Sequence, residues 1–352
     1  MNSIEKSLQE VIDKTVNKGK VFGISFAINR DDTTWNIASG NLSVNQSYFI
    51  ASVTKLFTSA VIFRLEYEKK ICLDDKISKY LGSSIINRIH IFNGQDFSNE
   101  ISIKHLLAHT SGLPDYFQDG EKKDNSLKDE IINGKDRSWT FEQVVERTKM
   151  IKPLFAPDSK NKAHYSDTNY QLLGKIIESV TGKSYSENCK EFIINPLGLS
   201  KTYLYQNFSD KTPKTLYYKS NELKIPKSMT SFGADGGIVS NSSELLMFVK
   251  GFFTGLLFPV EYINKIQIWN KIFFPLQSGI GIHKFQLPWI FNPANKIPYF
   301  IGHSGLSGAL AFYSPKENIF ISGTTNQAAY PDLSFKTMIK LTEILIRNKQ
   351  VK

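Results

Sequence analysis

The spacing of hydrophobic residues predicts strands near both ends of the chain and helices between them. Residues 21–29 and 34–38 form two apolar runs joined by a turn at 30–32, which is typical of a pair of strands. Near the other end, residues 309–313 and 319–323 are short apolar runs separated by Ser314-Pro-Lys-Glu-Asn318, which predicts a hairpin. Strands at both ends with helices inserted between them indicate an α+β fold, with an antiparallel sheet built from both chain ends and flanked by helices.

Apolar residues recur at helical spacing in several segments. The segment that begins at residue 52 is apolar beyond a single stripe, which predicts a helix buried on most sides. Gly19 and Gly182 follow two of the segments, as expected at the ends of helices. The predicted helices lie within residues 4–16, 52–65, 101–109, 170–180 and 335–345.

Length and composition favour one composite domain. The chain has 352 residues, of which 41% are hydrophobic, so it can bury a large core. It contains no linker rich in glycine, serine or proline, no internal repeat and no low-complexity tract. We therefore expect a single domain over residues 1–352, with a sheet region at about 1–50 and 230–352 and a mainly helical region at about 51–229.

Charge and cysteine content change this picture little. The formal net charge is +10, but the lysines are scattered and often lie near acids. This favours a solvated basic surface over a nucleic-acid or anionic-membrane partner. Neither Cys72 nor Cys189 has a cysteine or histidine neighbour at metal-ligand spacing, so we expect neither a disulfide framework nor a metal site.

The sequence also bears on location. No segment approaches 18 apolar residues, so no membrane span is expected. The N-terminal segment has the pattern of an amphipathic helix rather than of a signal peptide. The expectation is a cytoplasmic protein, or a periplasmic or secreted one if a signal was removed.

The candidate chemistry begins in Phe49-Ile-Ala-Ser-Val-Thr-Lys55, where a serine and a lysine stand three residues apart. On a helix, positions i and i+3 share a face, so Lys55 can place its amine near the Ser52 hydroxyl. The first turn of a helix also stabilises negative charge that develops on a nucleophile there. The structural alternative is that Ser52 is an N-cap and Lys55 a solvated side chain.

Two further motifs favour the catalytic interpretation. Tyr165-Ser-Asp167 precedes a helix, and Gly302-His-Ser-Gly-Leu306 precedes the terminal strand pair. With these motifs the sequence resembles the penicillin-recognising serine hydrolases, the family of class C β-lactamases, D-alanyl-D-alanine peptidases and related esterases. Other local matches run over nearly the whole chain, at residues 73–75, 103–114, 165–174, 196–199 and 236–240.

The resemblance implies a β-lactamase/transpeptidase-like fold and an acyl-enzyme mechanism. Ser52 would attack a carbonyl and be acylated, while Lys55 and Tyr165 share the proton transfers. The backbone N–H groups of Ser52 and Leu306 would form the oxyanion hole. Gly305 would leave room for a substrate to lie along the strand edge.

Asp167, His303 and Ser304 are expected to bind or support the substrate, and the first two depart from the family's common pattern. Asp167 stands where asparagine is usual, and its carboxylate would favour a substrate amine or hold Lys55 charged; alternatively, it caps the following helix. His303 stands where many β-lactamases have lysine. Because histidine is only partly protonated near neutral pH, a permanent cation for a substrate carboxylate is missing.

The reaction is predicted more closely than the substrate. We expect a serine hydrolase that acts on an ester or amide, in a small molecule or short peptide, through an acyl-enzyme at Ser52. Carboxylesterase, D-amino-acid peptidase and β-lactamase are alternatives within that class. A non-catalytic or slowly deacylating penicillin-binding or sensor-like protein is the alternative outside it. No cofactor is expected, and the oligomeric state is left open.

Two weaker patterns favour structural explanations. His105 and His109 lie four residues apart, as in a helical zinc pair, but the glutamate of H-E-x-x-H is absent. The aromatic-rich run from Trp269 to Trp289 could line a hydrophobic acyl pocket, although core packing is the simpler interpretation.

Overall fold

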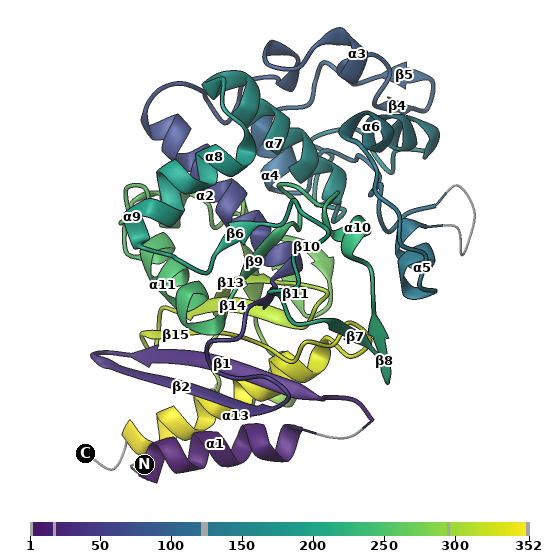
Figure 1. The fold of residues 1–352 in the computed structure, drawn as a ribbon. Coiled ribbons are helices and arrows are strands. Elements are labelled where there is room, and N and C mark those ends of the chain that lie inside the picture. The colour runs from purple at the N-terminus through teal and green to yellow at the C-terminus, as the bar shows by residue number, and fades with distance from the viewer. Residues whose placement is uncertain (1–2, 17–18, 121–125, 294–295, 350–352) are drawn as a thin grey trace.

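The computed structural model describes residues 3–16, 19–120, 126–293 and 296–349 (Figure 1). Within these residues, one large antiparallel sheet has the strand order β10-β11-β12-β13-β14-β15-β1-β2. Its strands are β1 (Gly23–Arg30), β2 (Thr33–Gly40), β10 (Asn270–Phe273), β11 (Leu276–Ser278), β12 (His283–Phe285), β13 (Phe300–Ser304), β14 (Ala309–Ser314) and β15 (Ile319–Thr324).

The remaining strands form three small sheets. Strands β3 (Tyr48–Phe49), β9 (Ile238–Ser240) and β6 (Tyr203–Leu204) pair in that order, next to the start of helix α2 (Thr54–Tyr67). The other two sheets are short hairpins, β4 (Ile91–Phe92) with β5 (Gln95–Asp96) and β7 (Leu216–Tyr218) with β8 (Asn221–Leu223).

The helices vary in length from single turns to the long C-terminal helix. They are α1 (Ser3–Thr15), α2 (Thr54–Tyr67), α3 (Ser83–Ile86), α4 (Ile103–Leu107), α5 (Leu127–Ile132), α6 (Phe141–Met150), α7 (Asp167–Thr181), α8 (Tyr185–Cys189), α9 (Asn195–Leu197), α10 (Pro226–Met229), α11 (Ser242–Phe253), α12 (Tyr262–Lys265) and α13 (Asp332–Lys349). Among the described residues, three 3₁₀ turns are η1 (Ala51–Val53), η2 (Ile77–Lys79) and η4 (Trp289–Phe291), and one π-helical turn is η3 (Lys190–Ile194).

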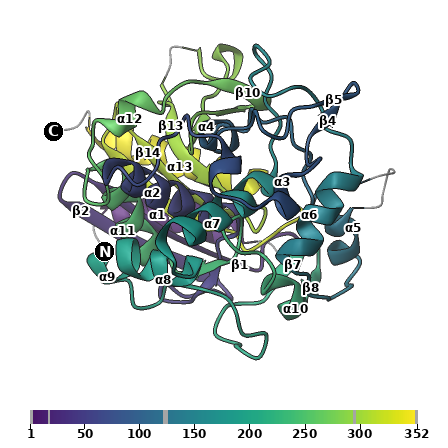
Figure 2. The same cartoon turned by 90° about the horizontal axis from the view of Figure 1, so that it is seen from above.

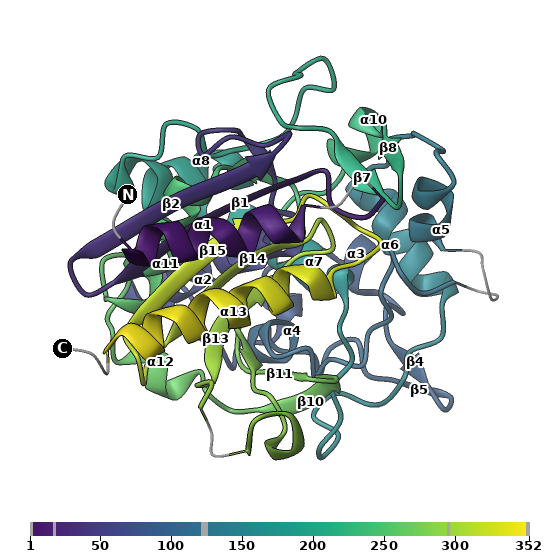
Figure 3. The same cartoon turned by 90° about the horizontal axis from the view of Figure 1, so that it is seen from below.

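Both faces of the large sheet are covered. Figure 3 shows α1 and α13 side by side across one face, and Figure 2 shows α2, α7, α8 and α11 on the other side. The central strands alternate accordingly: Leu310 and Phe312 of β14 pack with α1 and α13, whereas Ala309 and Ala311 face the opposite core. The small side chains let α11 approach the sheet closely. The α+β class and the sheet built from both chain ends are confirmed.

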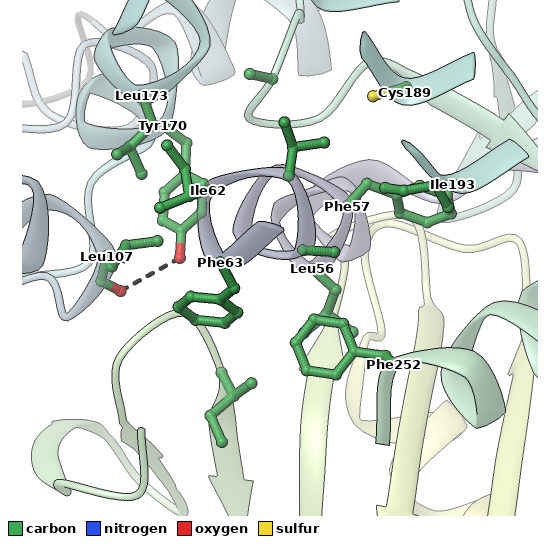
Figure 4. Close-up of a cluster of buried hydrophobic side chains, with 14 of the residues drawn as sticks. Leu56, Phe57, Ile62, Phe63, Leu107, Tyr170, Leu173, Cys189, Ile193 and Phe252 are labelled. Carbon is green, nitrogen blue, oxygen red and sulfur yellow. Dashed lines mark hydrogen bonds between the residues drawn. The ribbon is translucent and has the colours of Figure 1, made fainter. Parts of the chain in front are cut away.

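Helix α2 runs through the core between the sheet and the helical region. Nearly every residue from Thr54 to Leu65 is buried, and Figure 4 shows Phe57, Ile62 and Phe63 pointing to different sides of the helix. Tyr170 of α7 packs beside it and donates a hydrogen bond to the Leu107 carbonyl at 3.2 Å. This tight packing fixes the N-terminal end of α2, where the candidate nucleophile lies.

Candidate active site

The site begins where the 3₁₀ turn η1 leads into α2. Ser52 lies in this turn and is half-buried, whereas Lys55, on the first turn of α2, has 0% of its surface exposed. The residue that caps α2 is Val53, which offers no side-chain cap. The structural alternative for this motif is therefore wrong, because Ser52 does not cap the helix and Lys55 is not solvated.

The Lys55 amine lies among three oxygen atoms. Its Nζ donates to Ser52 Oγ at 3.2 Å, to Asp167 Oδ1 at 2.5 Å and to the Asp235 backbone carbonyl at 2.6 Å. An ammonium has three N–H donors and no acceptor, so these contacts use all of them. Such pairing is what a buried charge requires. Because Ser52 Oγ accepts from Lys55, its own proton is free for another partner.

Asp167 is the first residue of α7, and its carboxylate faces Lys55. The cap of α7 is Ser166, and it makes no side-chain cap hydrogen bond. Asp167 is 6% exposed and forms a buried ion pair with Lys55. The alternative in which Asp167 serves only as a helix cap is therefore wrong. Its position in the first turn still places the carboxylate at the favourable end of the helix dipole.

Tyr165 completes the group around Ser52. Its ring is partly exposed, stacks on His109 with centroids 4.6 Å apart, and lies 5.0 Å from Lys55 Nζ. Burial of the phenol and the charge of Asp167 raise the pKa of Tyr165 well above its ordinary value, while a hydrogen bond with Ser52 opposes this shift. Tyr165 is therefore a protonated phenol at neutral pH, which suits a general acid.

Two further buried carboxyls, which sequence reasoning missed, lie near Asp167. Burial and the charge of Asp167 raise the pKa of Asp235 to about 7 and that of Asp115 well above its ordinary value. The Asp235 carboxyl accepts from the Tyr116 hydroxyl at 2.8 Å and from the Gln171 amide at 3.1 Å. Asp235 contacts Lys55 through its backbone carbonyl, which every residue type has. No sequence motif therefore marks this position.

The third motif brings the end of β13 against the backbone of the nucleophile. A Cβ at Gly305 would lie 2.4 Å from the Ile50 carbonyl oxygen and 3.1 Å from the Ser52 nitrogen, so only glycine fits. Ser304 ends β13 and is half-buried. Leu306, the next residue after Gly305, lines a pocket together with Ser52.

His303 is buried behind this edge rather than exposed to solvent. It is 1% exposed, stacks on His283 with ring centroids 3.9 Å apart, and its Nδ1 lies 2.8 Å from the Ser304 carbonyl. Burial, with His283 and Lys55 nearby, holds the pKa of His303 well below its ordinary value. It is therefore neutral near pH 7, not partly protonated as the sequence suggested. His283, which the sequence indicates as a surface or packing residue, is buried and pairs with Gly302 across β12 and β13.

An apolar pocket of about 310 Å³ opens beside Ser52. Its lining includes Phe49, Phe117, Leu216, Ile225, Phe232 and Leu306, with Asp167 and Asp235 near the nucleophile. Among the described residues, none between Trp269 and Trp289 lines this pocket.

The two spaced histidines of the middle region have separate partners. His105 Nδ1 accepts from the Ser102 N–H within a capping box, whereas His109 Nδ1 accepts from the Ser166 N–H at 3.1 Å. Across the described part of the chain, no group of three or more histidine, cysteine, aspartate or glutamate side chains could hold a metal ion. No helix in those residues is long and apolar enough to cross a membrane.

The chain is similar in sequence to two proteins of Staphylococcus aureus. The chain is 30% identical over 350 residues to protein flp of Staphylococcus aureus (strain MRSA252), covering 94% of this chain and 65% of that protein. It is 30% identical over 246 residues to the teichoic acid D-alanine hydrolase of Staphylococcus aureus, covering 68% of this chain and 51% of that protein. The chain thus spans about 65% of the length of protein flp.

A solved structure shares the fold over its full length. The D-amino acid amidase from Ochrobactrum anthropi SV3, complexed with L-phenylalanine, superposes with a TM-score of 0.81 at 20% identity, covering 99% of this chain and 100% of that one. The sequence profile of the family described as Beta-lactamase matches residues 8–339. The chain therefore belongs to the Beta-lactamase family.

Proposed function

We propose that this protein hydrolyses D-aminoacyl esters or amides through an acyl-enzyme at Ser52. The observation that carries the proposal is the buried chain of contacts from Ser52 Oγ through Lys55 Nζ to Asp167 Oδ1. It joins a nucleophile to an amine and the amine to a carboxylate, next to an apolar pocket open to a substrate.

Acylation would start with a proton transfer from the Lys55 ammonium to the Asp167 carboxylate, which leaves a neutral amine. That amine takes the Ser52 hydroxyl proton as Oγ forms a bond to the substrate carbonyl carbon. The carbonyl oxygen becomes an oxyanion, and the backbone N–H groups of Ser52 and Leu306 stabilise it. The close approach of the Gly305 backbone to Ser52 supports this pairing of donors.

Collapse of the tetrahedral intermediate would release the alcohol or amine. Tyr165 supplies the proton to the leaving group, because its raised pKa keeps the phenol protonated. The ammonium re-formed on Lys55 then returns a proton to the Tyr165 phenolate. Water next attacks the acyl carbon, and the same groups accept its proton and protonate Ser52.

The charges in the site support an amine-bearing substrate without a recognised carboxylate. His303 is neutral, so it supplies no cation for a substrate carboxylate. Asp167 lines the pocket, where its carboxylate can pair with a substrate ammonium. The D configuration is supported by two relatives, named teichoic acid D-alanine hydrolase and D-amino acid amidase.

Side-by-side kinetics test the proposal. We expect turnover of nitroanilides of D-alanine and D-phenylalanine and of a short-chain nitrophenyl ester, slower turnover of the L-enantiomers, and little turnover of a chromogenic cephalosporin. Ser52→Ala should abolish all activity. Ser59→Ala is the matched control, because it removes a hydroxyl of the same helix that donates to the Lys55 backbone carbonyl and hydrogen-bonds with Tyr170 rather than with Ser52.

Each alternative gives a different result. Full activity in Ser52→Ala would exclude the acyl-enzyme. Cephalosporin turnover that matches the D-alanine substrate would contradict the assigned selectivity. An adduct on Ser52 that persists for hours in intact-mass measurements, without turnover, would favour the penicillin-binding or sensor-like alternative.

A further inference from the structure

Five exposed apolar side chains lie on two turns at one end of the large sheet. Phe273 and Phe274 lie at the β10–β11 turn, and Trp289, Ile290 and Phe291 form the turn η4 that follows β12. Between 50% and 80% of each residue's surface is exposed to solvent. We call these five residues the apolar tip. Apolar side chains gathered on the surface indicate an interaction site.

The sheet register brings the two turns together. Phe273 pairs with Leu276 across the β10–β11 turn, and Leu276 pairs with Phe285, the last residue of β12. The turn and the chain that leaves β12 therefore lie at the same end of adjacent strands. Figure 3 shows β10 at the lower margin of the molecule with β11 beside it, away from β1 and β2. Leu276 and Phe285 are buried, so the tip rests on a packed base.

The chain around the apolar tip is uniformly basic. From residue 262 to residue 316 it carries five lysines and no aspartate or glutamate. Of these, Lys271, Lys296 and Lys316 are exposed, and Lys284 is half-buried. This stretch is an exception to the general pattern, in which the lysines often lie near acids. Exposed tryptophan and phenylalanine beside lysines form the combination that favours an anionic lipid interface.

We propose that the apolar tip docks on the surface of an anionic lipid bilayer. Trp289, Phe291 and Phe274 would enter the boundary between headgroups and acyl chains, while the nearby lysines attract the negative headgroups. Side chains at two adjacent turns suit shallow insertion into a fluid surface. A second copy of this chain fits less well, because pairing would set one acid-free basic stretch against another.

Docking in this way would bring the active site to the membrane surface. The Phe273 ring packs edge-on against Tyr165 with centroids 5.9 Å apart, so the apolar tip borders the catalytic group directly. A substrate held at the bilayer surface would then lie close to Tyr165. The proposal does not depend on which ester or amide is hydrolysed.

Vesicle binding tests the proposal with the full chain. We expect the protein to sediment with vesicles of phosphatidylglycerol and phosphatidylcholine, and its tryptophan fluorescence to shift to shorter wavelength, a shift that Trp289→Ser should remove. The triple variant Phe274→Ser, Trp289→Ser, Phe291→Ser should bind at least about a hundredfold more weakly, since three side chains lose their burial. Phe273 is left unchanged because it contacts Tyr165.

Matched controls separate the tip from general surface effects. Met150→Ser, Phe208→Ser and Leu256→Ser remove equally exposed side chains outside the tip, and that triple variant should bind as the wild type does. Lys271→Gln and Lys296→Gln should each weaken binding by about fivefold, only on vesicles that contain phosphatidylglycerol. Melting temperature serves as the folding control, so the test is independent of catalysis.

Three results would overturn the proposal. The first is no binding of the wild type to anionic vesicles, and the second is equal binding by the tip variant. The third is a wild-type dimer in sedimentation equilibrium that the tip substitutions dissociate, without vesicle binding, which would identify a second copy as the occupant.

Discussion

Asp167 is the residue whose chemistry departs most from the common pattern of the family. In the proposed reaction its carboxylate accepts a proton from Lys55, at the 2.5 Å contact between the two side chains. Asp167→Asn keeps the shape but removes that acceptor. We expect kcat/KM for a D-alanine ester to fall by about 10²- to 10⁴-fold, the usual contribution of a positioned acid or base, as measured by steady-state kinetics.

Asp235→Asn is the matched control for this substitution. Asp235 is as deeply buried, but it reaches Lys55 through its backbone carbonyl, which the substitution leaves in place. Its turnover should therefore stay much closer to that of the wild type. Wild-type kcat/KM in Asp167→Asn, with circular dichroism unchanged in both variants, would mean that the proton leaves Lys55 by another route.

The individual residues of the site were only partly predictable from sequence. Ser52, Lys55, Tyr165 and Asp167 stand in local motifs, and the structure brings these four together. The imidazole of His283 carries no such signal. It comes alongside His303 only through the register of β12 on β13, a long-range pairing that spacing along the chain does not encode.

Among the elements, the end of β13 and the turn η1 shape the site most directly, because their backbones approach each other closely at Gly305. Gly305→Ala would place a methyl group 2.4 Å from the Ile50 carbonyl oxygen and 3.1 Å from the Ser52 nitrogen. The two backbones must then separate, which misplaces the proposed oxyanion donors. We expect kcat to fall by at least about a hundredfold, as when one such donor is lost, with the burst of acylation slowed equally.

Gly82→Ala provides the comparison for the glycine substitution. The nearest atom that its Cβ would meet is 4.0 Å away, and the backbone there has no positive φ. Activity and melting temperature should therefore stay at wild-type values. Normal kcat in Gly305→Ala would show that the oxyanion is stabilised elsewhere than between Ser52 and Leu306.

The long elements followed from hydrophobic periodicity, and the short ones did not. The predicted hairpin at 309–323 is the observed pair β14 and β15, and the predicted helix ending before Gly182 is α7. Strands of two or three residues, such as β3 and β6, are too short for a periodic signal. The run from Trp269 to Trp289 divides between buried and exposed positions, because it includes the edge strand β10 as well as β11 and β12, which are paired on both sides.

For the whole molecule, burial of neutral imidazoles behind the site makes stability depend on pH. Burial lowers the pKa of His283 to about 3 and those of His109 and His303 well below the ordinary value. The unfolded chain binds these protons below about pH 6.5, so each histidine favours unfolding as the pH falls further. Asp235 and Asp115, with raised pKa values, act in the opposite direction: the stability that they contribute is lost as pH rises toward 7.

His90 and His105 also have lowered pKa values, so among the described residues five histidines against three carboxyls with raised pKa values, Glu66, Asp115 and Asp235, leave a net loss of stability on acidification from about pH 6.5 to 4.5. His283→Phe removes one histidine without breaking a bond, since neither ring nitrogen has a hydrogen-bond partner among the described residues. We expect the slope of unfolding free energy against pH to decrease by about 1.4 kcal/mol per pH unit, measured by urea unfolding. Phe285→Leu, on the same strand, should destabilise the protein equally at every pH. A wild-type slope in His283→Phe would mean that this imidazole is protonated in the folded protein, and that the cluster beside Tyr165 carries positive charge at acidic pH.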